Sequence, residues 1–254
     1  MTKSKNQISN QSFKSQSFNY LSFKYLFVIG ILSFVICCFS FSDSYAAPCY
    51  GTNMPNSGKL SVGAQVHSIE NRKLSDDYGK VASTQYFYTM SYGVFDWFSL
   101  DGKIGVGDVT YRPSAGQPKT TFPANFAGGY GFRLKPYKNI GQKIDVVCGF
   151  QHISAHPASR QVNGVTNYVI LDDWQVSALI SKEIGRFTPY AGGRLTRLDL
   201  IRRISGAERV RQRSDIRILP AIGADFNVTP SSFINAEVRF IDETSFNIGF
   251  THNF

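Results

Sequence analysis

The chain has 254 residues, enough for one large or two small domains, and a formal net charge of +9. Its composition is 43% hydrophobic and 14% aromatic but only 18% charged, below the ~25% of typical soluble domains, and it does not suggest a helical bundle. Four cysteines, two of them inside an apolar N-terminal stretch, exclude a disulfide framework and a cysteine-based zinc set.

Residues 1–46 are predicted to be a cleaved signal peptide. Residues 1–24 contain four lysines and no acidic residue, and the stretch Tyr25–Phe39 is apolar and uncharged. Ser44 and Ala46 provide the small side chains that precede a signal-peptidase cut. This arrangement predicts export across the inner membrane.

Two alternatives concern the same region. An uncleaved anchor is disfavoured because the apolar stretch is shorter than the ~20 residues that cross a bilayer. Lipidation at Cys49 is disfavoured by the preceding Pro48, which fits a lipobox poorly. Residues 47–58 are then expected to form a short periplasmic lead.

From residue 59 onward, apolar and polar residues alternate with a period of two, which is typical of β-strands. Short connections, such as Asp96–Trp97, and a somewhat longer one at Lys135–Gly141 alternate with long polar ones. The long connections are expected at Asn71–Lys80, Arg112–Thr120, His156–Asn167 and Ser205–Ser214. The last turn, at Asp242–Glu243, is short where a long one is expected. The pattern predicts ten strands, at 59–69, 81–95, 98–111, 121–134, 142–155, 169–183, 187–203, 215–226, 231–241 and 244–254.

Two features disturb the pattern. The apolar face shifts between Leu195 and Leu198, which predicts a β-bulge. Pro220 lies inside a predicted strand, although a closed sheet needs the backbone N–H that proline lacks. If the irregular strand or the last hairpin is misassigned, the barrel has eight strands.

The two faces of these strands predict a barrel that spans a membrane. One face carries four or more aromatic or aliphatic residues, too bulky for the interior of a small soluble barrel, whereas the other carries charges such as Asp101, Arg133 and Glu237. Only helices and closed barrels satisfy every backbone group within lipid. The expected fold is therefore an all-β, antiparallel, up-and-down transmembrane barrel over residues 59–254; the alternative is a soluble secreted β-sandwich.

The last strand carries a second signal. Phe246, Ile248, Phe250 and Phe254 lie on one face and resemble the C-terminal signal that the assembly machinery of bacterial outer-membrane barrels reads, although His252 replaces a commoner aromatic residue. FDWFSL, FTPYAGG and NAEVRFIDETSFNIGFTHNF are similar to segments of small outer-membrane barrels of the outer-membrane protein A and opacity class. The resemblance covers about residues 58–254. It implies that the protein lies in the outer membrane, contacts outer-membrane lipid and lipopolysaccharide, and binds the assembly machinery and periplasmic chaperones. It implies no shared catalytic residues.

One group of residues has the chemistry of an esterase. His152 and Ser154 lie on the outward face near the outer end of their strand, and Asp172 lies on the neighbouring strand. Serine, histidine and a carboxylate together can attack an acyl ester. The F-x-H-x-S spacing resembles that of outer-membrane lipid A deacylases, but Ala155 replaces their asparagine, a likely oxyanion donor. The preferred interpretation is that these are polar residues where the strand leaves the lipid, and that the protein is not an enzyme.

An arginine-rich segment is a candidate for binding lipopolysaccharide phosphates, since arginine binds phosphate in a bidentate manner. A solvated loop is the equal alternative, and nucleic acid is not expected outside the cell. The segment contains Arg202, Arg203, Arg209, Arg211 and Arg213.

The expected function is a structural or surface-interaction role, with no cofactor and no metal. Ten strands enclose a narrow lumen that side chains usually fill. Inward charges are expected to pair and plug it, and a narrow channel for small solutes is the alternative. These charges are Lys103, Arg133, Arg217 and Arg239 with Asp101, Asp145, Asp225 and Glu237.

Overall fold

The computed structural model describes residues 51–114, 118–162, 164–241 and 243–254. The predicted signal peptide and Cys49 lie outside these ranges. Within the described residues no helix is long and apolar enough to cross a membrane. The strands are β1 (Leu60–Lys73), β2 (Lys80–Phe95), β3 (Phe98–Arg112), β4 (Thr120–Asn139), β5 (Ile144–Ala155), β6 (Arg160–Val162), β7 (Val165–Lys182), β8 (Phe187–Ile204), β9 (Arg209–Arg213), β10 (Arg217–Thr229), β11 (Ser232–Arg239) and β12 (Glu243–Asn253).

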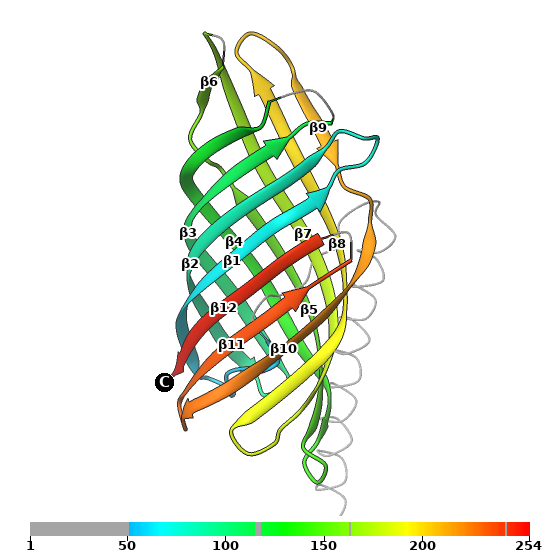
Figure 1. The fold of residues 1–254 in the computed structure, drawn as a ribbon. Helices are drawn as coiled ribbons and strands as arrows, with labels where there is room; N and C mark the ends of the chain where they lie inside the picture. The colour runs from blue at the N-terminus through cyan, green and yellow to red at the C-terminus, as the bar shows by residue number, and fades with distance from the viewer. Residues whose placement is uncertain (1–50, 115–117, 163, 242) are drawn as a thin grey trace, which may run out of the picture. The chain divides into compact units, whose positions relative to one another are not determined.

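Ten of these strands form a closed antiparallel barrel (Figure 1). Neighbouring strands pair in chain order, β1 pairs with β12, and β7 pairs with β8, so the ring has no free edge. The N–H of Phe254 also donates to the carbonyl of Leu60 (2.9 Å), which joins the last strand to the first. The predicted fold class is confirmed, with ten strands and not eight.

The two short strands extend the barrel at its outer end, the end remote from the C-terminus (Figure 1). β6 pairs with β7 beyond the end of β5, and β9 pairs with β8 beyond the end of β10. Each short strand thus extends a long one after a break in the chain. β6 extends β5, and β9 extends β10. The predicted loops His156–Asn167 and Ser205–Ser214 therefore contain strand residues.

One sequence-based boundary needs correction, and the unexpected proline inside a strand is explained. β4 continues to Asn139 and pairs with β5 there, after a register shift between Leu134 and Tyr137, so most of the connection expected at Lys135–Gly141 is strand. Pro220 is accommodated because the pairing of β10 with β11 begins only at Ala221.

The polarity of the two faces reverses toward the outer end of the barrel. In β7, Asp173 and Gln175 are buried in the lumen, while Trp174 lies on the outside. Farther out, Val169 and Leu171 are buried in the lumen instead. The apolar face thus changes sides within one continuous strand.

β8 shows the same reversal, and this explains its irregular sequence. Arg194 is buried in the lumen, whereas Leu198 and Leu200 take the inward positions farther along. The register with β7 runs without a shift from Tyr190 to Ile204. The bulge predicted between Leu195 and Leu198 is therefore wrong: the apolar residues change face while the backbone stays regular.

The reversal creates an apolar layer that fills the outer part of the lumen. It is contributed by β1 to β5, by β7 and β8, and by the loop after β1. Its members are Ile69, Leu74, Val81, Phe87, Val109, Tyr111, Phe122, Ala127, Ile153, Ala155, Val169, Leu171, Leu198 and Leu200.

The described part of the predicted lead folds against the inner mouth of the barrel. Thr52 and Met54 are buried. The backbone N–H groups of Thr52 and Asn53 donate to the carboxylate of Asp225 (3.3 and 3.1 Å), and Arg133 donates to the carbonyl of Asn53 (2.6 Å). Residues 51–55 therefore close part of the inner end of the lumen.

Candidate functional site

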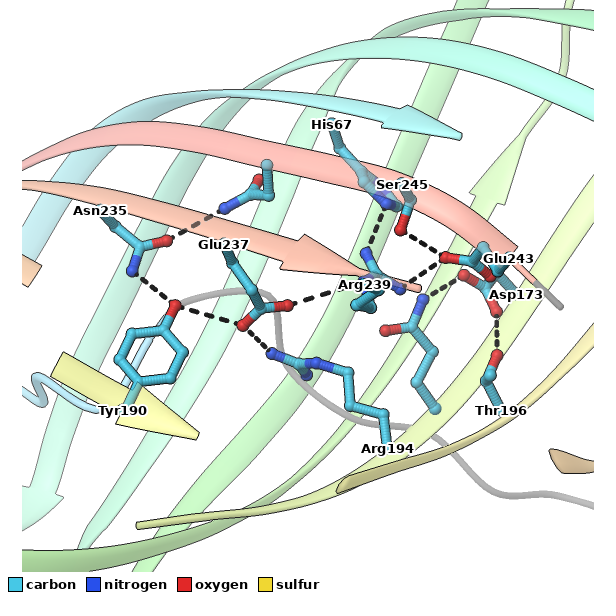
Figure 2. A network of polar contacts seen from close by, with 12 residues as sticks. His67, Asp173, Tyr190, Arg194, Thr196, Asn235, Glu237, Arg239, Glu243 and Ser245 are labelled. Carbon is cyan, nitrogen blue, oxygen red and sulfur yellow. Dashed lines mark hydrogen bonds and ion pairs between the residues drawn. The ribbon is translucent and has the colours of Figure 1, made fainter. Parts of the chain in front are cut away.

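A network of charged side chains crosses the middle of the lumen, centred on Glu237 of β11 (Figure 2). Arg194 of β8 is hydrogen-bonded to one oxygen of Glu237, to which Tyr190 also donates (3.2 Å). The other oxygen of Glu237 lies 3.6 Å from Nε of Arg239. Both members of each ion pair are almost completely buried.

Arg239 extends this network toward β12 and β1 (Figure 2). Its Nη1 lies 3.1 Å from Oε1 of Glu243, and its Nη2 donates to Nε2 of His67 (2.6 Å). Arg72 reaches the second oxygen of Glu243 (3.3 Å), and Ser245 donates to Oε1 (2.6 Å). This pairing offsets part of the desolvation cost of burying the charges.

A second buried ion pair lies nearer the inner mouth. Arg133 donates from Nε and Nη2 to the two oxygens of Asp101 (2.9 and 2.8 Å), a bidentate arrangement. The predicted inward charges Asp101, Arg133, Glu237 and Arg239 are thus paired with one another or with neighbours. Arg217 differs in position, because its side chain is 49% exposed and pairs with the exposed Asp215 (3.1 Å).

At the outer rim, the structure brings together Ser154 of β5 and Asp172 of β7. The two residues face each other across the strand pair, and the Ser154 hydroxyl donates to Oδ1 of Asp172 (2.5 Å). Nε2 of His156, which follows β5, lies 2.9 Å from the same hydroxyl. His156 was not among the predicted residues, since it follows the end of the predicted strand 142–155, although its spacing of two from Ser154 continues the same face.

His152 contributes differently from what its spacing suggests. Its Nε2 lies 3.7 Å from Oδ1 of Asp172, and its ring stacks on Trp174, with a centroid distance of 4.0 Å. Ala155 is buried in the apolar layer of the lumen, on the opposite side of the sheet from Ser154. A side chain at position 155 therefore points away from any ester bound at Ser154.

The predicted arginines do not form one cluster. Arg211 and Arg213 lie 3.8 and 3.9 Å from the buried carboxylate of Asp199, which also accepts a hydrogen bond from Arg197 (3.2 Å). Arg202 instead lies over the ring of Tyr111, 4.5 Å from its centroid.

Arg203 and Arg209 lie farther out and line a separate hollow. They are directly opposite each other in the pairing of β8 with β9, and both are exposed. The guanidinium of Arg203 lies 6.0 Å from the centroid of the Tyr168 ring.

The junction between β9 and β10 is held by the loop after β1. The backbone N–H of Ser75 donates to the carbonyl of Arg213 (2.7 Å), and its hydroxyl donates to Asp215 (2.6 Å). The hydrogen bond from the Ser75 hydroxyl, together with the guanidinium of Arg217, holds the pKa of the Asp215 carboxyl below its ordinary value. Asp215 therefore remains an anion when the pH falls moderately.

The predicted assembly signal lies on the outer surface. Phe246, Ile248, Phe250 and Phe254 are 39%, 52%, 47% and 63% exposed. Within the described part of the chain, no three histidine, cysteine or acidic side chains are arranged to hold a metal ion.

No family model and no curated protein matches the sequence. Among solved structures, the chain is similar to the translocator domain of the autotransporter NalP from Neisseria meningitidis, at 12% identity over 78% of this chain and 90% of that one, with a TM-score of 0.45. An outer-membrane channel from Pseudomonas putida F1 is 11% identical over 82% and 99%, with a TM-score of 0.44. The attachment invasion locus protein Ail of Yersinia pestis is 14% identical over 79% and 100%, with a TM-score of 0.23. Such values describe a shared barrel form and carry no argument for a shared role.

Proposed function

We propose that this chain is an integral outer-membrane protein whose barrel is closed to solutes and whose function is exerted at its outer surface. The observation that carries the proposal is the reversal of polarity along the strands. In the inner and middle parts of the barrel, apolar side chains cover the outer surface and charged side chains fill the lumen. At the outer end, apolar side chains fill the lumen instead. A barrel immersed in lipid up to the reversal, and in water beyond it, requires this distribution.

The size of the outward apolar band supports the proposal. β3 carries no outward charge from Phe98 to Val106, a length of about 27 Å at ~3.4 Å per residue. With the ~40° tilt usual for such strands, this segment covers roughly 21 Å of membrane thickness, near the ~25 Å of outer-membrane barrels. Exposed Tyr86, Tyr88 and Ile104 belong to the same surface.

Three successive layers support a closed lumen. Residues 51–55 lie at the inner mouth, the Glu237 network crosses the middle, and the apolar layer fills the outer end. Passage of an ion through the apolar layer would remove its hydration without offering polar partners. We therefore favour a non-conducting barrel over the narrow channel.

Extraction and reconstitution test this function. The folded protein should resist carbonate extraction, migrate differently on a gel before and after boiling, and insert into lipid vesicles. In planar bilayers it should give no stable large conductance. A water-soluble monomer would contradict the membrane assignment, and a steady open channel would contradict the closed lumen.

A second candidate function is hydrolysis of an acyl ester at the outer leaflet, favoured by the contacts of Ser154. Its hydroxyl is hydrogen-bonded to Asp172 and lies beside Nε2 of His156. Either group could accept the serine proton as the oxygen attacks an ester carbonyl. The ester C–O bond then breaks, the alcohol leaves with that proton, and water cleaves the resulting acyl-enzyme to release the fatty acid and the free serine. Because Ala155 faces the lumen, an oxyanion donor would have to come from elsewhere.

Release of fatty acid from lipid A tests this candidate. If it is correct, the reconstituted protein releases acyl chains, Ser154→Ala abolishes the release, and Ser68→Ala, a rim serine of β1, leaves it unchanged. Absence of release by the unaltered protein, or full release by Ser154→Ala, would exclude the esterase.

A further inference from the structure

A pocket of about 380 Å³ lies at the outer end of the barrel wall, beyond the level of Ser154. Its walls come from the interruption between β5 and β6 and from the outer parts of β7, β8 and β9. Tyr168, Ile170 and Ile201 provide an apolar surface, and His156, Arg203 and Arg209 provide the charged or titratable side chains. None of the residues that line this pocket is acidic.

The two arginines are arranged at an electrostatic cost. Arg203 and Arg209 are directly opposite each other across β8 and β9, where like charges destabilise a strand pair. Among the described residues neither has a carboxylate within ion-pair distance, whereas the neighbouring Arg211 and Arg213 share Asp199. An anion between Arg203 and Arg209 would remove this repulsion and accept their hydrogen bonds.

The position of the pocket indicates what kind of anion it receives. Along β7, Trp174 is the last large apolar residue of the outward band, and Ile170 lies four residues beyond it. For a tilted strand this separation is roughly 10 Å along the membrane normal. This is the level of lipid headgroups, since the polar regions add several Å to each side of the ~30 Å hydrocarbon core.

We propose that this pocket binds a phosphate group of an outer-leaflet lipid, with Arg203 and Arg209 as the phosphate ligands. Tyr168, Ile170 and Ile201 contact the apolar part of the same lipid headgroup. The inference rests on the proposed membrane insertion, and it selects two of the five predicted arginines. Arg202, Arg211 and Arg213 are already engaged with Tyr111 or Asp199.

Binding is measured with the full-length folded protein in detergent micelles, using lipid A, dephosphorylated lipid A and inorganic phosphate as probes. The protein should prefer lipid A over its dephosphorylated form by at least about tenfold, the change expected for lost charge-assisted hydrogen bonds. The double variant Arg203→Gln, Arg209→Gln should lose the preference. A matched double variant at the inner end of the same hairpin, Lys182→Gln with Arg186→Gln, should keep it.

Heat-modifiable migration and vesicle insertion are checked first for each variant, so that loss of the fold is not mistaken for loss of binding. If the unaltered protein fails to insert, the membrane assignment fails. If it inserts but binds both forms of lipid A equally, or if the Arg203 and Arg209 variant binds normally, only the lipid site is refuted. Inorganic phosphate that competes at the concentration of the lipid would refute the lipid as the source of the phosphate.

Discussion

The charged layer around Glu237 and the apolar layer around Leu200 occupy the same lumen, yet they have opposite compositions. Outside the charged layer, the wall carries Ile104, Tyr88 and similar residues; outside the apolar layer, it carries Asp172 and the arginines near Asp199. The comparison shows that the medium around a strand determines which face is apolar. In lipid the apolar face turns outward, and in water it turns inward as in a soluble protein.

The largest effect is expected in the charged layer. Glu237→Gln should lower the free energy of unfolding by about 3–5 kcal/mol, because Arg194 and Arg239 would each lose a buried counter-charge. Urea-induced unfolding in detergent or lipid vesicles measures the change. Glu208→Gln, at an exposed position, is the matched control. Equal free energies of unfolding for the two variants would show that the charges around Glu237 are in contact with water and not buried.

The apolar layer is tested by removing one of its side chains. Leu200→Ala should cost about 2–5 kcal/mol, since Leu200 is fully buried and the substitution leaves a cavity. Leu195→Ala, on the outside of the same strand, should cost less because lipid refills the space. If Leu195→Ala is the more destabilising of the two, the assignment of inside and outside on β8 is wrong.

The outer surface is tested by placing a charge on either side of the polarity reversal. Ile104→Arg should cost about 2–4 kcal/mol in vesicles, because Ile104 is 61% exposed in the middle of the apolar band. Tyr168→Arg, on the outward face near the outer end of β7, should cost roughly 0–1 kcal/mol. Similar unfolding free energies for both variants would contradict a lipid boundary between the two positions.

The smallest effect is expected at the rim. Arg211 is 49% exposed and shares Asp199 with two other arginines. Arg211→Gln should therefore change the free energy of unfolding by no more than about 1 kcal/mol, as for other surface ion pairs. A much larger loss, measured by the same urea titration, would mean that the rim is a rigid, desolvated part of the barrel.

Most of the architecture was predictable because closed sheets are strongly patterned. The alternation of residues such as Tyr86, Tyr88 and Met90 against polar neighbours located ten strands, and the structure contains all ten. The pattern assigned the charged face to the lumen along each whole strand, however, and did not show that this assignment reverses toward the outer end. The reversal near Leu198 therefore looked like a bulge, since a change of face and a change of register give the same sequence signal.

The candidate sites were predictable only in part. The outward pair Ser154 and Asp172 followed from spacing and strand order, whereas His156 lies just beyond the end of the predicted strand, where a loop was expected. The role of Arg203 and Arg209 depends on their being opposite each other, which requires the register of β9, a strand expected to be a loop. The burial of residues 51–55 depends on Asp225 and Arg133, far away in sequence.

The most direct test of the account is a spin-label scan along the outward face of β7 in lipid vesicles. Single labels at positions 168, 170, 174 and 176 are introduced by cysteine substitution in a Cys148→Ser background without other cysteines. Accessibility to oxygen should be highest at position 176, and accessibility to a water-soluble nickel complex should rise sharply between positions 174 and 170. Equal access of the nickel complex to positions 176 and 168 would contradict a membrane boundary at Asp172.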